Sequence, residues 1–80
     1  MKEKNETHLV ALKQGQLATI LSIAACHKTV KRLADMGLTT NTQIKILRKA
    51  GIHGPIEIEV KGSNLILGKG IVSKILVKKI

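Results

Sequence analysis

The side chains that could bind a metal ion are few and scattered along the chain. Cys26 and His27 are adjacent, and His8 and His53 complete the set of cysteines and histidines. Structural zinc sites usually present Cys or His in pairs at short fixed spacings. If Cys26 and His27 lie on a strand, they point to opposite faces and only one reaches a given site. We therefore expect no intrinsic metal site. The weak candidates for metal ligands are Cys26, His27 and His53.

A catalytic site is also hard to assemble from this sequence. Glu57 and Glu59 alternate with apolar residues, so they share the predicted solvent face of a strand, whereas acid–base catalysis needs a protected carboxyl group. The pair Cys26-His27 lacks a third group to orient it as a nucleophile. Gly68-Lys69-Gly70 lacks the spacing of a phosphate-binding loop, and we predict a hairpin turn there. We expect no catalytic residues, no enzymatic activity and no cofactor beyond transient ferrous iron or another divalent metal.

Basic residues dominate the composition. The chain has 14 Lys and Arg against 5 Asp and Glu, which gives a formal net charge of +9. This balance attracts nucleic acids, anionic membrane surfaces or acidic protein faces. The cations that could contact phosphates are Lys28, Lys31, Arg32, Lys45, Arg48, Lys49, Lys61, Lys69, Lys74, Lys78 and Lys79. Small barrels that bind single strands normally stack bases on aromatic side chains, and this chain has none. Nucleic-acid binding is therefore an alternative and not the leading hypothesis.

Length and composition favour one small cytoplasmic domain. The chain has 80 residues, 44% of them hydrophobic, so the core must be built from aliphatic side chains. One cysteine excludes an internal disulfide and fits a reducing compartment. The charged start MKEKNETH is not a secretory signal. The apolar stretch Leu17–Cys26 has about ten residues, whereas roughly 20 are needed to cross a bilayer.

The expected elements are mainly strands. The β-branched stretch Leu17–Ile23 predicts a first strand, and residues 28–35 predict a short helix with Thr29 as its amino-terminal cap. Alternating apolar residues and glycine turns then predict strands around 44–46, 56–60, 65–67 and 75–77. The pattern indicates a small SH3-like β-barrel of about five strands, with the helix between the first and second. Residues 1–8 are expected to form a flexible tail, and residues 9–80 a single domain.

The helix exit raises a question that the sequence leaves open. Gly37 suits the left-handed position after a helix, and in that motif the next apolar residue, Leu38, often packs back on the last turn. Met36 and Leu38 could instead form an exposed apolar pair beside basic residues, which would suit a reversible protein contact. We weigh these two interpretations equally for Met36 and Leu38, and we place Leu33 in the core.

The order of several motifs resembles a known family. The motifs are Leu12–Gly15, Arg32–Leu38, Gly54–Gly62, Leu65–Leu67 and Ile75–Val77. Together they resemble ferrous iron transport protein A, the FeoA family of small cytosolic proteins with an SH3-like barrel. The chain differs in having Thr40-Asn41 where the family usually has Pro-Gly, and Gln14 in place of a proline. Asparagine tolerates left-handed backbone angles, so we expect the turn to be kept.

The resemblance implies a regulatory binding protein without enzymatic activity or a strong iron site. Its implied partner is FeoB, a membrane ferrous iron permease with a cytosolic GTP-binding domain, which could recruit the chain to the inner face of the membrane. The candidate partner-binding residues are Lys28, Lys31, Arg32, Met36, Leu38, Ile52 and His53. A metal-binding sensor or delivery module remains a further alternative. The same module occurs in metal-dependent repressors, which carry an additional DNA-reading domain.

Overall fold

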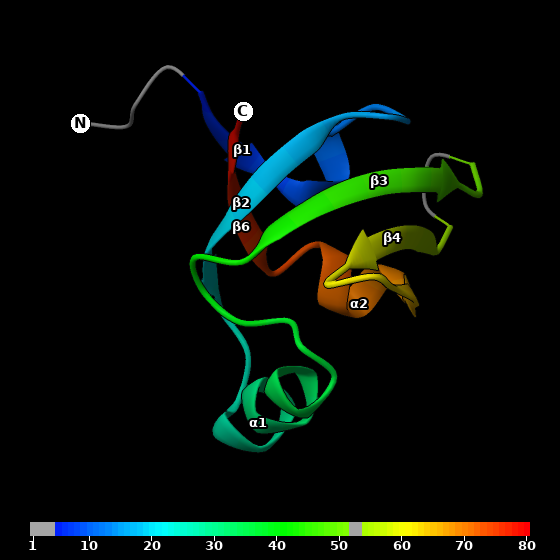
Figure 1. Cartoon of the computed structure of the whole chain (residues 1–80). Helices are drawn as coiled ribbons and strands as arrows, with labels where there is room; N and C mark the ends of the chain where they lie inside the picture. The colour runs from blue at the N-terminus through cyan, green and yellow to red at the C-terminus, as the bar shows by residue number, and fades with distance from the viewer. Residues whose placement is uncertain (1–4, 52–53) are drawn as a thin grey trace.

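The computed structural model describes residues 5–51 and 54–80. One antiparallel sheet has the strand order β1-β6-β2-β3-β4-β5 (Figure 1). The strands are β1 (Glu6–His8), β2 (Leu17–Ile23), β3 (Gln43–Lys49), β4 (Ile56–Val60), β5 (Ser63–Leu67) and β6 (Ile75–Lys79). The helical segments are η1 (Leu9–Ala11), α1 (His27–Asp35) and α2 (Lys69–Val72). The predicted class, mainly β with a short helix, is confirmed. The structure has six strands where about five were predicted, and α1 lies between the second and third strands because β1 was not predicted.

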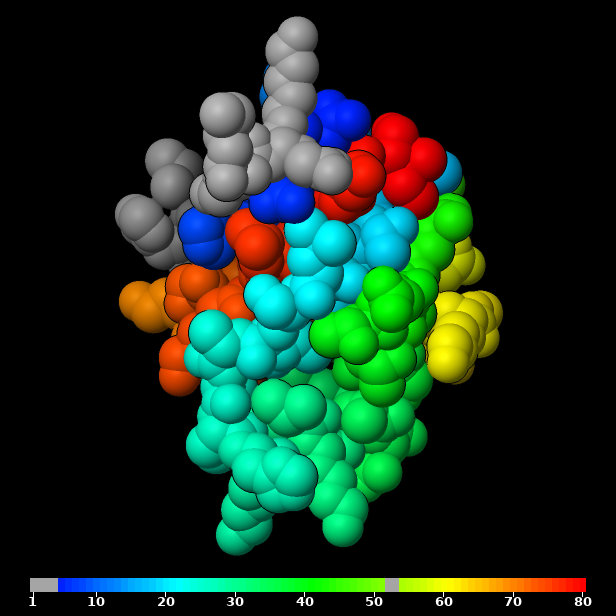
Figure 2. Space-filling model, turned by 90° about the vertical axis from the view of Figure 1, so that its left-hand side faces the viewer, coloured from blue at the N-terminus to red at the C-terminus, as the bar shows by residue number. Residues whose placement is uncertain are grey.

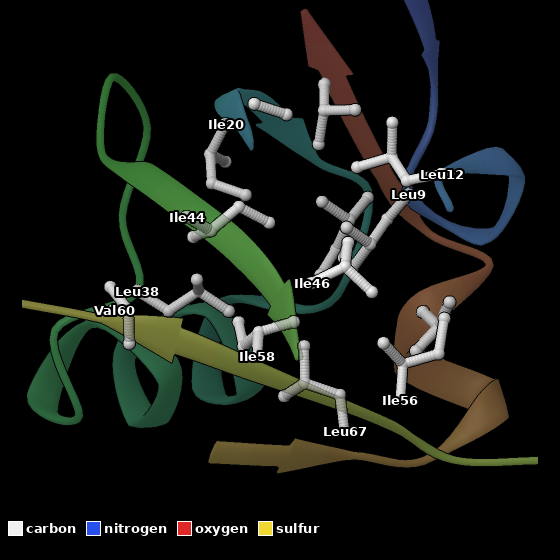
Figure 3. Close-up of a cluster of buried hydrophobic side chains, with 14 of the residues drawn as sticks. Leu9, Leu12, Ile20, Leu38, Ile44, Ile46, Ile56, Ile58, Val60 and Leu67 are labelled. Atoms are coloured by element: carbon white, nitrogen blue, oxygen red, sulfur yellow. The ribbon is translucent and has the colours of Figure 1, made fainter. Parts of the chain in front are cut away.

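Alternation along the strands builds the core, as predicted. Ile44 and Ile46 of β3 are buried, as are Ile56, Ile58 and Val60 of β4, while the residues between them are more exposed. Figure 3 shows these side chains pointing into one aliphatic cluster. The other members of the cluster are Leu9, Leu12, Ala18, Ile20, Leu33, Leu38, Leu67, Val72, Ile75 and Val77.

The first strand, β1, lies in the segment predicted as a flexible tail, and for Glu6–His8 that prediction is wrong. Thr7 faces Val77 of β6, and Lys79 N–H donates to the carbonyl of Asn5 at 2.9 Å. These residues carry no large apolar side chain that would indicate a strand. Backbone pairing with β6 holds them, and such pairing leaves no hydrophobic pattern in the sequence.

The predicted hairpin turn at Gly68-Lys69-Gly70 is also wrong. Gly68 is the residue before the one-turn helix α2, whose first bond runs from Val72 N–H to the Gly68 carbonyl at 3.0 Å. The reason is topological: β5 and β6 are not neighbours in the sheet, so a tight turn could not join them. The helix carries the chain across and buries Val72 in the core.

The start of α1 differs from the prediction, whereas its end agrees with it. Cys26 is the capping residue, and Thr29, predicted for that position, lies in the first turn. At the other end Gly37 has φ +93°, and its N–H donates to the Ala34 carbonyl at 2.9 Å. Leu38 N–H donates to the Leu33 carbonyl, also at 2.9 Å. These two bonds define a Schellman cap, which reverses the chain and sends Leu38 into the core.

The turn after this cap also keeps its expected shape. Asn41 has φ +67°, so it takes the left-handed conformation that the family pattern gives to glycine. Its N–H donates to the Ile20 carbonyl at 2.7 Å, and the backbone carbonyl of Thr42 accepts from Ile20 N–H at 2.9 Å. The loop that leaves α1 is therefore fixed to β2 before it enters β3.

Candidate functional site

The basic residues predicted to bind a partner share one exposed face of α1. Lys28, Lys31 and Arg32 fall at i, i+3 and i+4, and all three side chains are exposed. Leu33, on the opposite face, is buried in the core. Figure 2 shows α1 and the loop after it at the lower end of this view. The helix thus presents three cations to solvent from one rigid element.

Met36 and Leu38, which the sequence could not separate, have opposite roles in the structure. Met36 is 47% exposed, whereas Leu38 is fully buried. The proposal of Leu38 as a partner-binding residue is therefore corrected, because the cap at Gly37 turns it inward. Met36 stays available on the surface, immediately after the basic face of α1.

A shallow depression lies between α1 and α2. Its volume is about 570 Å³, and its lining residues are Thr29, Arg32, Leu33, Asp35, Met36 and Ile71. Met36, Leu33 and Ile71 provide the apolar part of its lining, and Arg32 and Asp35 provide the charged part. Ile71 was missed by the sequence analysis, because its segment was predicted as a turn followed by a strand. We call the face formed by Lys28, Lys31, Arg32 and Met36, together with this depression, the α1 surface.

The remaining candidate contacts, Ile52 and His53, lie outside the described residues. Their roles as partner contacts, and that of His53 as a metal ligand, stay predictions.

Cys26 lies exposed at the start of α1, beside the α1 surface. Its Sγ lies 3.2 Å from Thr29 Oγ1. A hydrogen bond with the hydroxyl of Thr29 is the main reason why the pKa of Cys26 lies below its usual range. A hydrogen bond with the backbone of Thr29 and the positive charge of Lys74 lower this pKa further. Across residues 5–51 and 54–80, no three Cys, His, Asp or Glu side chains gather into a possible metal site. Cys26 and His27 are thus exposed neighbours at a helix start.

We expect replacement of Thr29 by valine to raise the pKa of Cys26, because the hydroxyl that stabilises the thiolate is lost. The rate of alkylation by iodoacetamide would then rise at a higher pH than in the wild type. Thr40→Val, an exposed threonine outside α1, is the matched control. Identical pH profiles for Thr29→Val and the wild type would contradict this assignment.

Two of the cations considered for phosphate binding are engaged within the protein. Arg48 Nη2 lies 3.1 Å from Glu57 Oε1, across the β3–β4 pair. Lys49 Nζ donates to the carbonyls of Val10 and Leu12 at 2.8 and 2.9 Å, which ties β3 to η1. Glu57 and Glu59 lie on the outer face of β4, as predicted. Contacts to Arg48 and Lys49 would therefore compete with bonds that the fold already uses.

No helix in the described part of the chain is long and apolar enough to cross a membrane.

Comparison with known proteins identifies the family. The FeoA domain model matches residues 7–79. A Methanocaldococcus jannaschii protein assigned as Fe(2+) transport protein A is 33% identical over 70 residues, covering 88% of this chain and 83% of that protein. The crystal structure of an iron uptake regulatory protein, FeoA, has a TM-score of 0.84 at 29% identity, covering 94% of this chain and 99% of the other.

A solution structure of FeoA from Chlorobium tepidum gives a TM-score of 0.85 at 32% identity, covering 92% of this chain and 70% of that one. The matched region includes every strand except the first residue of β1. The expected SH3-like fold of the resemblance is confirmed by these structures. The chain therefore belongs to the FeoA family, which is associated with ferrous iron transport.

Proposed function

We propose that this chain is an accessory protein of ferrous iron uptake that docks on the cytosolic part of a FeoB-type permease. Family membership supports the link to iron transport. The single observation that carries docking is the α1 surface, where three exposed cations stand next to an exposed methionine. The chain acts by binding and performs no reaction of its own, at the inner face of the membrane that holds the permease.

The physical chemistry of the α1 surface suits a reversible contact with an acidic partner. Lys28, Lys31 and Arg32 steer a negatively charged surface toward α1 and raise the rate of encounter. Met36 and the depression beside it then receive an apolar side chain, and methionine adapts well to different shapes. Charge sets orientation, and burial of Met36 lowers the rate of dissociation.

A calorimetric titration of the purified protein into the cytosolic domain of the FeoB-type permease tests the proposal. We expect saturable binding at physiological salt that weakens as salt is added, because the cations of α1 are exposed. Titrations with and without a GTP analogue show whether the nucleotide state of the partner matters. A parallel titration with single-stranded DNA is the control for non-specific charge. Absence of binding to the domain and to the intact permease would contradict the proposal.

A further inference from the structure

Strand β5 ends the sheet, and its outer edge has no partner strand in the described part of the chain. It pairs with β4 over its whole length, from Val60↔Ser63 to Ile56↔Leu67. Its sequence, SNLIL, contains no charge, no proline and no glycine. Proteins usually protect a free edge with lysine, proline or a bulge, because its unpaired backbone groups can pair with another strand. The β5 edge has none of these features.

The turn before β5 determines which backbone groups point outward. Lys61 and Gly62 have φ +51° and +80°, as in a type I′ turn, which makes Val60 and Ser63 a hydrogen-bonded pair. Bonding alternates along an antiparallel ladder. Leu65 and Leu67 therefore also bond to β4. The N–H and C=O groups of Asn64 and Ile66 point away from the sheet, to the free edge.

The side chains of β5 include apolar surface that a second strand would cover. Ile66 is 69% exposed, on the outer face opposite Glu57. Leu65 is half-buried at the border of the core. Ile66 thus has both an exposed apolar side chain and backbone groups that point to the free edge.

Charge indicates which partner fits this edge. Positive and negative charges balance on the outer face beside β5, because Lys45 faces Glu59 and Arg48 forms an ion pair with Glu57. The rest of the chain carries the net charge of +9, which repels a second copy and attracts an acidic partner. Between Lys61 and Lys69 at its two ends, the surface next to β5 is locally neutral, so a second copy of this chain meets little repulsion along this edge.

We propose that β5 pairs antiparallel with β5 of a second copy, about a two-fold axis at Leu65. In this register Asn64 faces Ile66 of the second copy, so the residues whose backbone groups point outward meet each other. Leu65 meets its own copy on the inner face. The pairing leaves α1 free, so a dimer would present two α1 surfaces to a membrane-bound partner.

The salt dependence of this dimer is opposite to that of docking through α1. Lys61 and Lys69 stand beyond the two ends of β5 and would face each other across the pair. Added salt screens this repulsion and the repulsion between two basic molecules, so it strengthens the dimer. Failure of one proposal can thus be distinguished from failure of the other.

Sedimentation velocity from micromolar to millimolar protein, at low and high salt, tests the dimer. We expect the average mass to rise with concentration, and more so at high salt. Ile66→Lys should weaken the dimer at least about tenfold. Each copy then presents a charged lysine at the edge in place of an apolar side chain, and the two like charges repel each other. Ile80→Lys, which adds the same charge to another isoleucine that is 68% exposed, is the matched control and should leave the dimer unchanged.

Two further measurements keep the test decisive. Thermal melts show whether Ile66→Lys is folded, and amide hydrogen exchange of Asn64 and Ile66 in the wild type should slow as protein concentration rises. A monomer throughout the concentration range would overturn the proposal. A dimer that both variants weaken equally would also overturn it, as would a dimer whose Asn64 and Ile66 amides are not protected from hydrogen exchange. Binding of β5 to a permease segment, without any self-association, would overturn it too.

Discussion

Leu38→Ser is expected to unfold the domain near room temperature, whereas Met36→Ser should leave its melting temperature almost unchanged. Leu38 is fully buried and follows the cap that ends α1, whereas Met36 is 47% exposed. Loss of a buried leucine side chain costs about 2–5 kcal/mol, and an unsatisfied buried hydroxyl adds about 1–3 kcal/mol. At about 0.05–0.15 kcal/mol per residue, a chain of 80 residues has a total stability of the same order.

Thermal melts followed by circular dichroism measure this difference. A loss of 1 kcal/mol lowers the melting temperature of a domain of this size by about 4–8 °C. Met36→Ser, which replaces another large apolar side chain with serine two residues away, should shift the melting temperature by less than that. A Leu38→Ser protein that melts within about 4 °C of the wild type would show that Leu38 is not part of the core.

The second large effect concerns binding. The double variant Lys31→Glu, Arg32→Glu is expected to weaken docking to the cytosolic domain of the permease by about tenfold to a hundredfold. Both side chains are exposed on one face of α1, so reversal replaces attraction to an acidic surface with repulsion. Because neither side chain is part of the core, the melting temperature should change little.

A matched variant separates the position of these charges from net charge. Lys13→Glu with Lys45→Glu makes the same change in total charge at exposed sites outside α1. Its affinity should fall by much less than that of the α1 variant at physiological salt, because screening limits charge effects to about 8 Å. Equal losses in the two variants would mean that only the overall charge matters, and that α1 is not the contact.

The sequence predicted those parts of the fold that leave a side-chain pattern. Alternation in β3 and β4 identified the buried residues Ile44, Ile46, Ile56, Ile58 and Val60. Gly37 predicted the end of the helix, because the position after a helix often has left-handed backbone angles, which favour glycine. Strand β1 and helix α2 were missed, because backbone pairing and a crossover between distant strands depend on tertiary topology.

The candidate site was predictable only in part for a related reason. The spacing of Lys28, Lys31 and Arg32 placed them on one face of a helix, and the structure keeps them exposed. Met36 is exposed and Leu38 is buried because the cap at Gly37 reverses the chain between them. Ile71 reaches the depression only through α2, so its position could not be inferred from its neighbours in sequence.

The central claim is that the α1 surface contacts the permease, and a nuclear magnetic resonance titration tests it most directly. Isotope-labelled protein would be titrated with the unlabelled cytosolic domain of the FeoB-type permease at physiological salt. We expect saturable shifts in the amides of α1, the methyl group of Met36 and the amide of Ile71. Amides of β5 should stay unchanged. Absence of shifts at saturating concentrations, or shifts confined to the outer face of β3, β4 and β5, would contradict the claim.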